Sequence, residues 1–426
     1  MIEASVLLLA LLVALLLSST SIAVALGFTS LIYFYYFTVV PMTQVPERLF
    51  NALNSFPLMA VPFFVFAANI MARGGISRRL TEFGAAMIGH FRGGLGAAAV
   101  LACIFFAAVS GSSPATVVAV GALLIPAMMR NGYPKSFATG LVATSGSLGI
   151  LIPPSIPLIV YGIATEQSIG DLFLGGVLPG LMAGVMLVVM VILVARKRRY
   201  GNKDGSQKAS WRTRWKTFRS ASLALLLPFI VLGGIYLGIF TPTEAAAVAV
   251  AYALVVSICV YREIKVADIW KVALGSAKTS AMVMFIIANG VLFTFVLTLE
   301  RIPVTASDAI AAWDLQPWQF LILVNILLLA VGCVMETSSA ILILAPILLP
   351  IALELGVDPI HFGIVMVMNL EIGMITPPLG LNLFVASGLS RMSVLQVAKA
   401  ALPSAIVLFV ALMIVTFVPF LSTAFI

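Results

Sequence analysis

Charged residues are scarce in this sequence. Asp, Glu, Lys and Arg make up 9% of the 426 residues, whereas hydrophobic residues make up 62%. Soluble domains usually carry about 25% charged residues, so this composition excludes an ordinary soluble domain. The chain contains about a dozen apolar stretches long enough to cross or deeply enter a bilayer at roughly 20 residues per span. The composition therefore predicts an integral membrane protein with many spans.

Cysteine and histidine are also rare, which argues against several kinds of chemistry. The three cysteines, Cys103, Cys259 and Cys333, lie far apart in apolar surroundings, so packing is favoured over disulfides or a metal site. The two histidines are His90, in a predicted loop, and His361, at the start of a predicted span. Their positions are typical of interfacial residues rather than of proton carriers.

Motifs of the common enzyme and pump classes are absent from the sequence. The stretch 275–280 reads GSAKTS and lacks the glycine that precedes the lysine in a P-loop, which argues against nucleotide-driven pumping. There is no H-E-x-x-H, and no histidine stands in a span neighbouring Ser112 and Ser113 to act as a base for a membrane-embedded hydrolase. We therefore expect no enzymatic activity.

Positive charge is concentrated in one segment. Residues 196–219 hold ten basic residues and one acid, Asp204, in a chain whose net charge is +8. Between two spans, such a segment indicates a cytoplasmic loop by the positive-inside rule, rather than a nucleic-acid-binding surface. Contact with anionic membrane lipids is compatible with this location.

Two apolar segments must enter the membrane and return on the same side. Residues 93–129 lie between Arg92 and Arg130 and turn at the uncharged sequence SGSSP, Ser110 to Pro114. Residues 318–353 turn likewise at Met335 to Ala340. Each segment is either two full spans or a re-entrant hairpin, and in the first segment a turn of Ser and Gly without charge favours a buried hairpin tip.

Two further segments are interrupted by glycine and double proline. Residues 147–157 read SLGILIPPSIP and residues 371–381 read EIGMITPPLGL. Proline removes a backbone donor, and lipid offers no replacement partner, so such breaks are tolerated where the backbone is buried or lines a cavity. We expect interrupted helices over 136–164 and 360–388. The remaining spans are predicted at 1–17, 172–195, 222–240, 244–261, 279–299 and 401–424, with an amphipathic stretch over 262–278.

The two halves of the chain match at an offset of 224 residues. Pro126, Gly132 and Gly149 fall on Pro350, Gly356 and Gly373, and Pro153-Pro154 falls on Pro377-Pro378, without a gap. Each half then holds five crossings and one hairpin, and because five is odd the second half is inverted. Inverted repeats with interrupted helices are typical of secondary transporters.

These observations predict an all-α polytopic membrane protein of two inverted repeats, each with about five spans, a re-entrant helical hairpin and a discontinuous helix. Residues 1–92 are expected to form first-repeat scaffold spans with connecting helices. Hairpins and interrupted helices of a transport domain are expected in 93–171 and 318–390, scaffold spans with the basic loop in 172–317, and a C-terminal span in 391–426.

Oxygen-bearing side chains surround the four broken elements. A broken helix exposes carbonyl oxygens that suit a hard cation and amide hydrogens that suit a carboxylate. The scarcity of nitrogen and sulfur ligands favours sodium over a transition metal. Glu336 and Glu371 are the carboxylates closest to the membrane interior, and Glu336 can equally cap a half-helix. The oxygen-bearing side chains are Ser110, Ser112, Ser113, Thr116, Thr144, Ser145 and Ser147 in the first half, and Glu336, Thr337, Ser338, Ser339, Asn369, Glu371, Thr376 and Asn382 in the second.

Several long motifs resemble one transporter family. They are AAVSGSSPATVVAVGALLIPAM (107–128), TSGSLGILIPPSIPLIVYGIAT (144–165), GIFTPTEAAAVAVAYA (238–253), APILLPIALELGVDPIHFGIV (345–365) and PPLGLNLFVASG (377–388). Together they are similar to the large membrane subunit of tripartite ATP-independent periplasmic (TRAP) transporters. The forms SGSSPATVVAVG and GLNLFVASG look most like the four-carbon dicarboxylate branch, although Thr337 stands where we expect proline in that branch.

The resemblance implies a sodium-driven importer of a small carboxylate in a bacterial or archaeal inner membrane. It implies a small four-span membrane subunit and a periplasmic substrate-binding protein as partners, sodium as the coupling ion with no other cofactor, and an elevator-type motion of the transport domain.

The resemblance also places the sites. One sodium site would be formed by Ser110, Gly111, Ser112, Thr144 and Gly149, and the other by Glu336, Thr337, Ser339, Gly373 and Thr376. Substrate would lie near Ser113, Thr116, Ser145, Ser338, Asn369 and Asn382.

Alternatives remain at this point. The substrate could be another carboxylate, such as a sugar acid, keto acid or sialic acid. A stand-alone antiporter of inverted-repeat design would also explain the broken helices.

Overall fold

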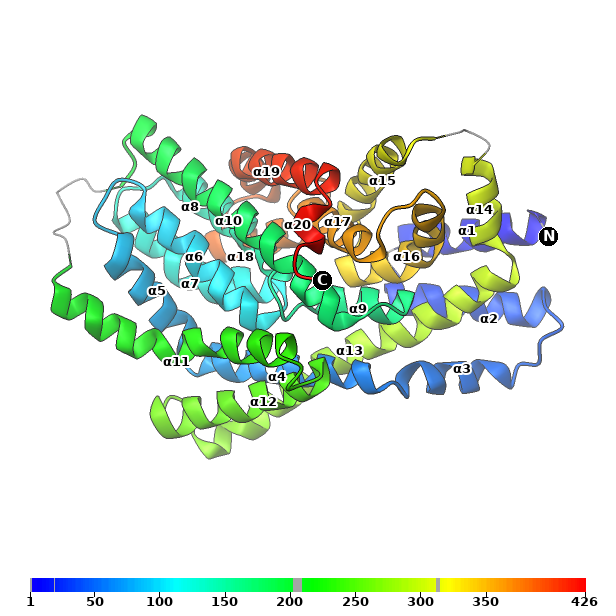
Figure 1. Ribbon diagram of the computed structural model, residues 1–426, viewed down its shortest axis with the longest axis horizontal. Coiled ribbons are helices and arrows are strands. Elements are labelled where there is room, and N and C mark those ends of the chain that lie inside the picture. The colour runs from blue at the N-terminus through cyan, green and yellow to red at the C-terminus, as the bar shows by residue number, and fades with distance from the viewer. Residues whose placement is uncertain (1, 19, 202–208, 312–314) are drawn as a thin grey trace.

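The computed structural model describes residues 2–18, 20–201, 209–311 and 315–426, which fold into helices α1 to α20 without a strand among these residues (Figure 1). Eight helical segments are long and apolar enough to cross a membrane. They are Phe56–Arg73, Ser113–Arg130, Ile169–Arg198, Trp211–Tyr236, Pro242–Val260, Val266–Leu299, Thr337–Glu354 and Val394–Phe417. The predicted all-α membrane architecture is confirmed.

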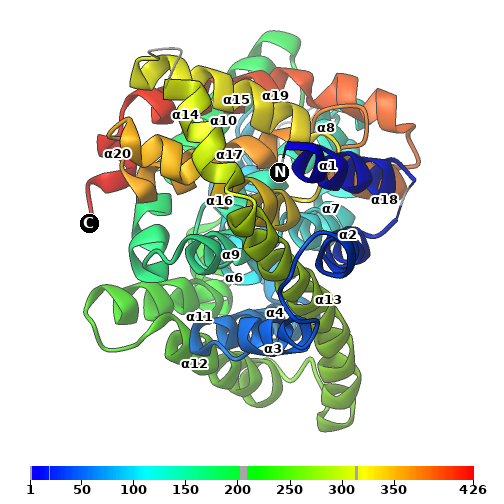
Figure 2. The same cartoon turned by 90° about the vertical axis from the view of Figure 1, so that its right-hand side faces the viewer.

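One group of helices forms a layer along one side of the molecule, at the bottom of both views (Figures 1 and 2). We call it the scaffold layer. It comprises α3 (Gln44–Leu53), α4 (Ala60–Arg73), α11 (Trp211–Tyr236), α12 (Pro242–Leu254) and α13 (Val266–Leu299). The helices α1 (Ile2–Leu17), α2 (Ile22–Tyr36) and α5 (Ile76–Ile88) lie next to it, and α2 packs along α13. Helix α14 (Ile302–Ala311) follows α13 and packs mainly against the helix Thr337–Glu354.

The hairpins and interrupted helices lie on the other side of the molecule, and we call them the hairpin body. The first hairpin is α6 (Gly94–Ser110) and α7 (Ser113–Arg130), and the second is α15 (Pro317–Gly332) and α16 (Thr337–Glu354). The interrupted helices are α8 (Lys135–Ser147) with α9 (Ile156–Thr165), and α17 (Pro359–Gly373) with α18 (Leu381–Ser390). The long helices α10 (Ile169–Arg198) and α19 (Val394–Phe417), with the short α20 (Phe420–Thr423), pack against them.

The predicted repeat is visible in the element bounds. Helices α7 and α16 begin and end 224 residues apart, and α8 and α17 begin at the same offset. The Pro153–Pro154 and Pro377–Pro378 bonds are both cis. The two halves therefore share local backbone geometry as well as landmark residues.

Local sequence explains where the broken elements end. Gly111, with φ of +59°, ends α6 in the left-handed conformation that glycine adopts without a Cβ penalty. Asp358 caps the start of α17, and its carboxylate accepts hydrogen bonds of 2.9 Å from the amides of Ile360 and His361. Every residue of α17 from Ile360 onward is buried, so this helix lies inside the hairpin body.

Three segments differ in detail from the sequence-based expectation. Residues 266–278 of the amphipathic stretch and the span 279–299 join into the single helix α13, because no proline interrupts the helical backbone between them. The loop predicted around His90 is short, because α5 continues to Ile88 and α6 begins at Gly94. The C-terminal span begins at Val394 rather than 401 and ends at Phe417.

Candidate substrate and cation site

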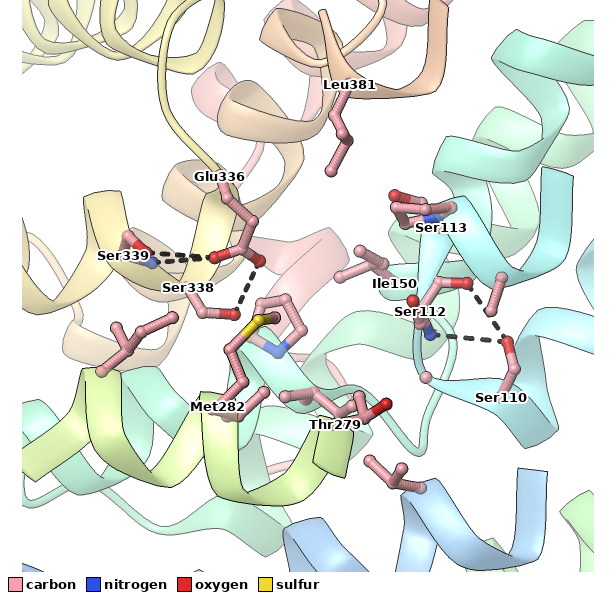
Figure 3. A pocket seen from close by; sticks show the side chains of 18 of the residues that line it. Ser110, Ser112, Ser113, Ile150, Thr279, Met282, Glu336, Ser338, Ser339 and Leu381 are labelled. Atoms are coloured by element: carbon pink, nitrogen blue, oxygen red, sulfur yellow. Dashed lines mark hydrogen bonds between the residues drawn. The ribbon is translucent and has the colours of Figure 1, made fainter. Parts of the chain in front are cut away.

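The two hairpin tips meet at a cavity of about 640 Å³. Figure 3 shows Ser110, Ser112 and Ser113 on one side of this cavity and Glu336, Ser338 and Ser339 on the other. The tips thus approach a common space from opposite sides, as expected for an inverted pair of hairpins. Helices α2, α4 and α13 form the remaining wall, so the cavity separates the hairpin body from the scaffold layer.

Hydroxyl groups close the first tip on itself. Ser110 Oγ lies 2.9 Å from Thr116 Oγ1, and Thr116 donates a hydrogen bond of 2.9 Å to the carbonyl of Ser112. The amide of Ile156, after the first double proline, donates to the carbonyl of Gly111 at 3.4 Å. The tip is therefore fixed both internally and to the interrupted helix.

Glu336 caps the second tip. Its carboxylate accepts hydrogen bonds from the amide of Ser339 at 3.1 Å and from the hydroxyls of Ser338 and Ser339 at 3.0 and 3.3 Å (Figure 3). A carboxylate at this position stabilises the positive end of the α16 dipole. The capping alternative considered for Glu336 is thus the arrangement seen in the structure.

Glu371 joins the second tip to the second interrupted helix. Its side chain is 2% exposed and lines the cavity. Thr337 donates a hydrogen bond of 2.7 Å to Oε1, whereas Oε2 is buried without a hydrogen-bond partner among the described residues. Because a buried carboxylate oxygen without a partner is costly, this oxygen is a natural ligand for a cation or a proton.

Asn382 plays the joining role in the first half. Its Nδ2 donates to Ser147 Oγ at 2.8 Å, and its Oδ1 accepts from Ser113 Oγ at 3.4 Å. Ser113 and Ser147 stand 224 residues before Thr337 and Glu371, respectively. In the first half, the Asn382 side chain of α18 bridges Ser113 and Ser147. In the second half, the matching residues Thr337 and Glu371 form a hydrogen bond with each other directly.

The scaffold layer supplies a mostly apolar wall with a few polar groups. Met282 and Thr279 of α13 face the hairpin tips (Figure 3). Asn69 of α4 donates to Ser276 of α13 at 2.9 Å, which ties the two scaffold helices together beside the cavity. The sequence alone did not indicate that α13 lines the cavity, although Ser276 and Thr279 lie in the stretch GSAKTS, which lacks the P-loop pattern.

The ionisable side chains that line the cavity are acidic. Glu336 and Glu371 line it, and no lysine or arginine does so among the residues that the structure describes. Positive electrostatic contributions come from the N-terminus of α7, where Ser112 makes no side-chain cap. At the N-terminus of α16, the Glu336 side chain already caps the backbone amides.

The structure brings about half of the expected site residues to the cavity surface. Those that line it are Ser110, Gly111, Ser112, Ser113, Glu336, Ser338 and Ser339. Each of Thr116, Thr337 and Asn382 forms a hydrogen bond with a residue that lines the cavity.

Two glycines of the expected site serve close packing. Gly149 lies directly against Ala107 of the first hairpin. A Cβ on Gly373 would come 2.5 Å from the backbone of Gly332 in the second hairpin. Each interrupted helix thus packs its breakpoint on the neighbouring hairpin with no room for a side chain.

The remaining expected residues have side chains that do not reach the cavity. Thr144 bonds to Gly140 at 2.9 Å and to Ser404 of α19 at 3.0 Å. Asn369 donates to the Asn325 carbonyl of α15 at 3.0 Å. Thr376, which follows α17, donates a hydrogen bond of 2.8 Å to the carbonyl of Ile372, and the buried Ser145 Oγ has no partner among the described residues.

The geometry is that of a secondary transporter with paired hairpins and interrupted helices. The family described as "Tripartite ATP-independent periplasmic transporter, DctM component" matches residues 9–421, and the chain belongs to this family. It is therefore a multi-pass inner-membrane permease and not an enzyme.

Individual relatives show how far the similarity extends. The chain is 46% identical, over 97% of both chains, to the C4-dicarboxylate TRAP transporter large permease protein DctM of Rhodobacter capsulatus. It is 42% identical over 93% of its length to the isethionate TRAP transporter permease protein DctMQ of Oleidesulfovibrio alaskensis, of which it covers 62%. The YdaH transporter of Alcanivorax borkumensis, described as having an unusual topology, shares the fold at a TM-score of 0.65 and 15% identity, over 96% of this chain and 98% of that one.

Proposed function

We propose that this permease imports a four-carbon dicarboxylate, such as succinate, fumarate or malate, together with sodium ions. The observation that carries the proposal is the lining of the cavity, which holds two acidic side chains and, among the described residues, no basic one. A dianion entering such a space meets repulsion unless cations enter with it. The name of the relative from Rhodobacter capsulatus supports the choice of substrate.

The arrangement of helix ends supports a position for one substrate carboxylate. The first turn of α7 begins at the cavity and presents backbone amides without a side-chain cap from Ser112. Helix N-termini bind carboxylates through these amides and the helix dipole. We assign one substrate carboxylate to this terminus, near Ser113, with Ser338 and Asn382 supporting the substrate from the second half.

The coupling ions are assigned to the oxygen-rich surroundings of the two tips. The first set is Ser110, Gly111, Ser112, Thr144 and Gly149, and the second is Glu336, Thr337, Ser339, Gly373 and Thr376. For Thr144, Gly149, Gly373 and Thr376 the backbone carbonyls are the candidate ligands. Thr116, Ser145 and Asn369 do not line the cavity, and we propose that they support the substrate-binding region from behind its surface.

Transport is proposed to follow an elevator motion in a three-component system. The hairpin body would move against the scaffold layer, with the cavity between them carrying the substrate. A small four-span subunit and a periplasmic substrate-binding protein are the expected partners, as the tripartite family description suggests. The apolar wall formed by Met282 and its neighbours supports sliding, because it offers few directional bonds to break.

The experiment is uptake of labelled succinate by proteoliposomes that contain the complete transporter, driven by an inward sodium gradient. Succinate, fumarate and malate are expected to compete with one another, whereas isethionate, a monovalent sulfonate, competes weakly. Efficient uptake of isethionate in place of succinate would overturn the substrate assignment.

Proton coupling is a second candidate, favoured by the unpartnered Glu371 Oε2. Glu371→Gln separates the two. If Glu371 binds sodium, the variant needs at least about tenfold more sodium, because it loses a charged ligand. If Glu371 carries the coupling protons, a pH gradient drives uptake by the parent protein without sodium, and the variant loses that response.

A further inference from the structure

A second pocket, which shares no lining residue with the transport cavity, lies near the start of α11. Its volume is about 790 Å³. Arg212, Lys216 and Arg219 of α11 line it, and Val260 and Tyr261 at the end of the α12 segment form its other wall. The three basic residues stand at i, i+4 and i+7, which places them on one face of the helix. The pocket is therefore built by two elements and not by a flexible charged tail.

The basic residues of this pocket have no acidic partner in the part of the chain that the structure describes. No aspartate or glutamate lines the pocket among the described residues, and none of the ion pairs there involves Arg212, Lys216 or Arg219. The neighbouring arginines differ in this respect. Arg78 and Arg79 both pair with Glu263, at 2.6 and 3.0 Å. Positive charge is thus neutralised just beside the pocket but not inside it.

The wall opposite the basic residues is fixed. Tyr261 donates a hydrogen bond of 2.7 Å to the carbonyl of Ser220 on α11, and its ring carries the guanidinium of Arg79 at 3.8 Å. A π-helical segment, Val255–Val260, leads into this wall, and such segments are frequent at functional sites. The pocket keeps its shape because both of its sides are tied together.

The position of the pocket along α11 points to the membrane surface. The apolar part of α11 starts at Ala221, directly after the basic residues. Trp211 and Trp215 are 78% and 58% exposed, and Trp215 also lines the pocket. Exposed tryptophans next to an apolar span mark the level of lipid headgroups. The positive-inside rule puts this end of α11 on the cytoplasmic side.

We propose that this pocket binds the phosphate-bearing headgroup of an anionic phospholipid in the cytoplasmic leaflet. Three cations on one helix face would hold the phosphate oxygens, and the tryptophans would lie alongside the glycerol and the first acyl carbons. Basic pockets between transmembrane helices on the cytoplasmic side bind such headgroups. The site is separate from the transport cavity and does not depend on the proposed substrate.

The test counts lipids bound to the purified full-length chain by native mass spectrometry, with added phosphatidylglycerol or phosphatidylcholine. The triple variant R212Q/K216Q/R219Q is expected to lose tightly bound phosphatidylglycerol and to bind it about tenfold more weakly. The matched control, R196Q/K197Q/R198Q, removes three charges from the end of α10, outside the pocket, and should bind like the parent chain.

Three results would overturn the proposal. Equal phosphatidylglycerol binding by the parent chain and the pocket variant would show that the pocket is not the site. Equal losses in both triple variants would indicate diffuse attraction by the basic segment. Displacement of the lipid by millimolar inorganic phosphate would identify a free-phosphate site. A monodisperse elution profile and an unchanged helical circular-dichroism spectrum show that the variants fold.

Discussion

Single side chains hold the broken elements together around the cavity. Asn382 is the clearest case, because one buried amide connects the first hairpin, the first interrupted helix and α18 through Ser113 and Ser147. Glu371 connects the second pair through Thr337. These contacts cross between parts of the chain that are distant in sequence, so they order the tips in a way that no local pattern could.

Asn382→Ala tests this role. Removing the amide leaves two buried hydroxyls with fewer partners, which costs about 1–3 kcal/mol. We expect a lower melting temperature in detergent and a raised KM for succinate. Asn131→Ala is the control, because Asn131 Nδ2 bonds to the carbonyl of Ala127 at 2.9 Å on the surface. A variant Asn382→Ala with parental stability and KM would contradict the bridging role.

At the scale of helices, each interrupted helix is positioned by close backbone contact with the neighbouring hairpin. Gly373 touches Gly332 of α15, and Gly149 touches Ala107 of α6. Because a similar contact occurs in both halves, the two repeats share a way of packing as well as a set of prolines. The breakpoints therefore cannot shift without moving the hairpin tips.

Gly373→Ala should displace the second hairpin. The new methyl group meets backbone atoms that cannot rotate away, so a cost of about 1–3 kcal/mol and a severe loss of uptake are expected. Gly388→Ala provides the control, since a Cβ there meets nothing within 4 Å, and alanine is favoured in a helix. Thermal unfolding and uptake measure both effects. Equal behaviour of the two variants would argue against the close-contact account.

The two double prolines differ in their surroundings, although they match in the repeat. Pro153 and Pro154 are buried, whereas Pro377 and Pro378 are exposed. Replacing either pair with alanines should reduce transport while the protein still inserts into the membrane. The P153A/P154A variant should also unfold at a lower temperature, because it loses buried contacts worth about 1–3 kcal/mol. Unchanged uptake by both variants would contradict the role of the breaks.

The elements were largely predictable from sequence, and the directions of their side chains were not. Glycine, proline and the repeat located both hairpin tips and both breaks. Thr144 and Asn369 face α19 and α15 instead of the cavity. Helix α17 is buried on all sides, so its sequence has no polar face from which the direction of Asn369 could be read.

The scaffold wall of the cavity was unpredictable for a different physical reason. Helix α13 brings Thr279 and Met282 to the tips only through packing between distant parts of the chain. Its sequence between 262 and 278 is charged enough to resemble a surface segment. The long helix forms because helical backbone bonds continue through this region, whatever the polarity of the side chains.

At the scale of the whole molecule, a cavity with two acidic side chains lies between an oxygen-rich hairpin body and a mostly apolar scaffold layer. In the proposed function, anion entry depends on cation entry, because no lysine or arginine lines this cavity among the described residues. The basic pocket at α11 lies on another part of the scaffold and serves a separate purpose in our account.

The central claim is that sodium ions accompany the dicarboxylate through the cavity. The most direct measurement follows labelled sodium and labelled succinate simultaneously in proteoliposomes that contain the complete transporter. We predict that both enter together and that replacing external sodium with potassium abolishes concentrative succinate uptake. Succinate accumulation without sodium entry, driven instead by an imposed proton gradient, would contradict the account.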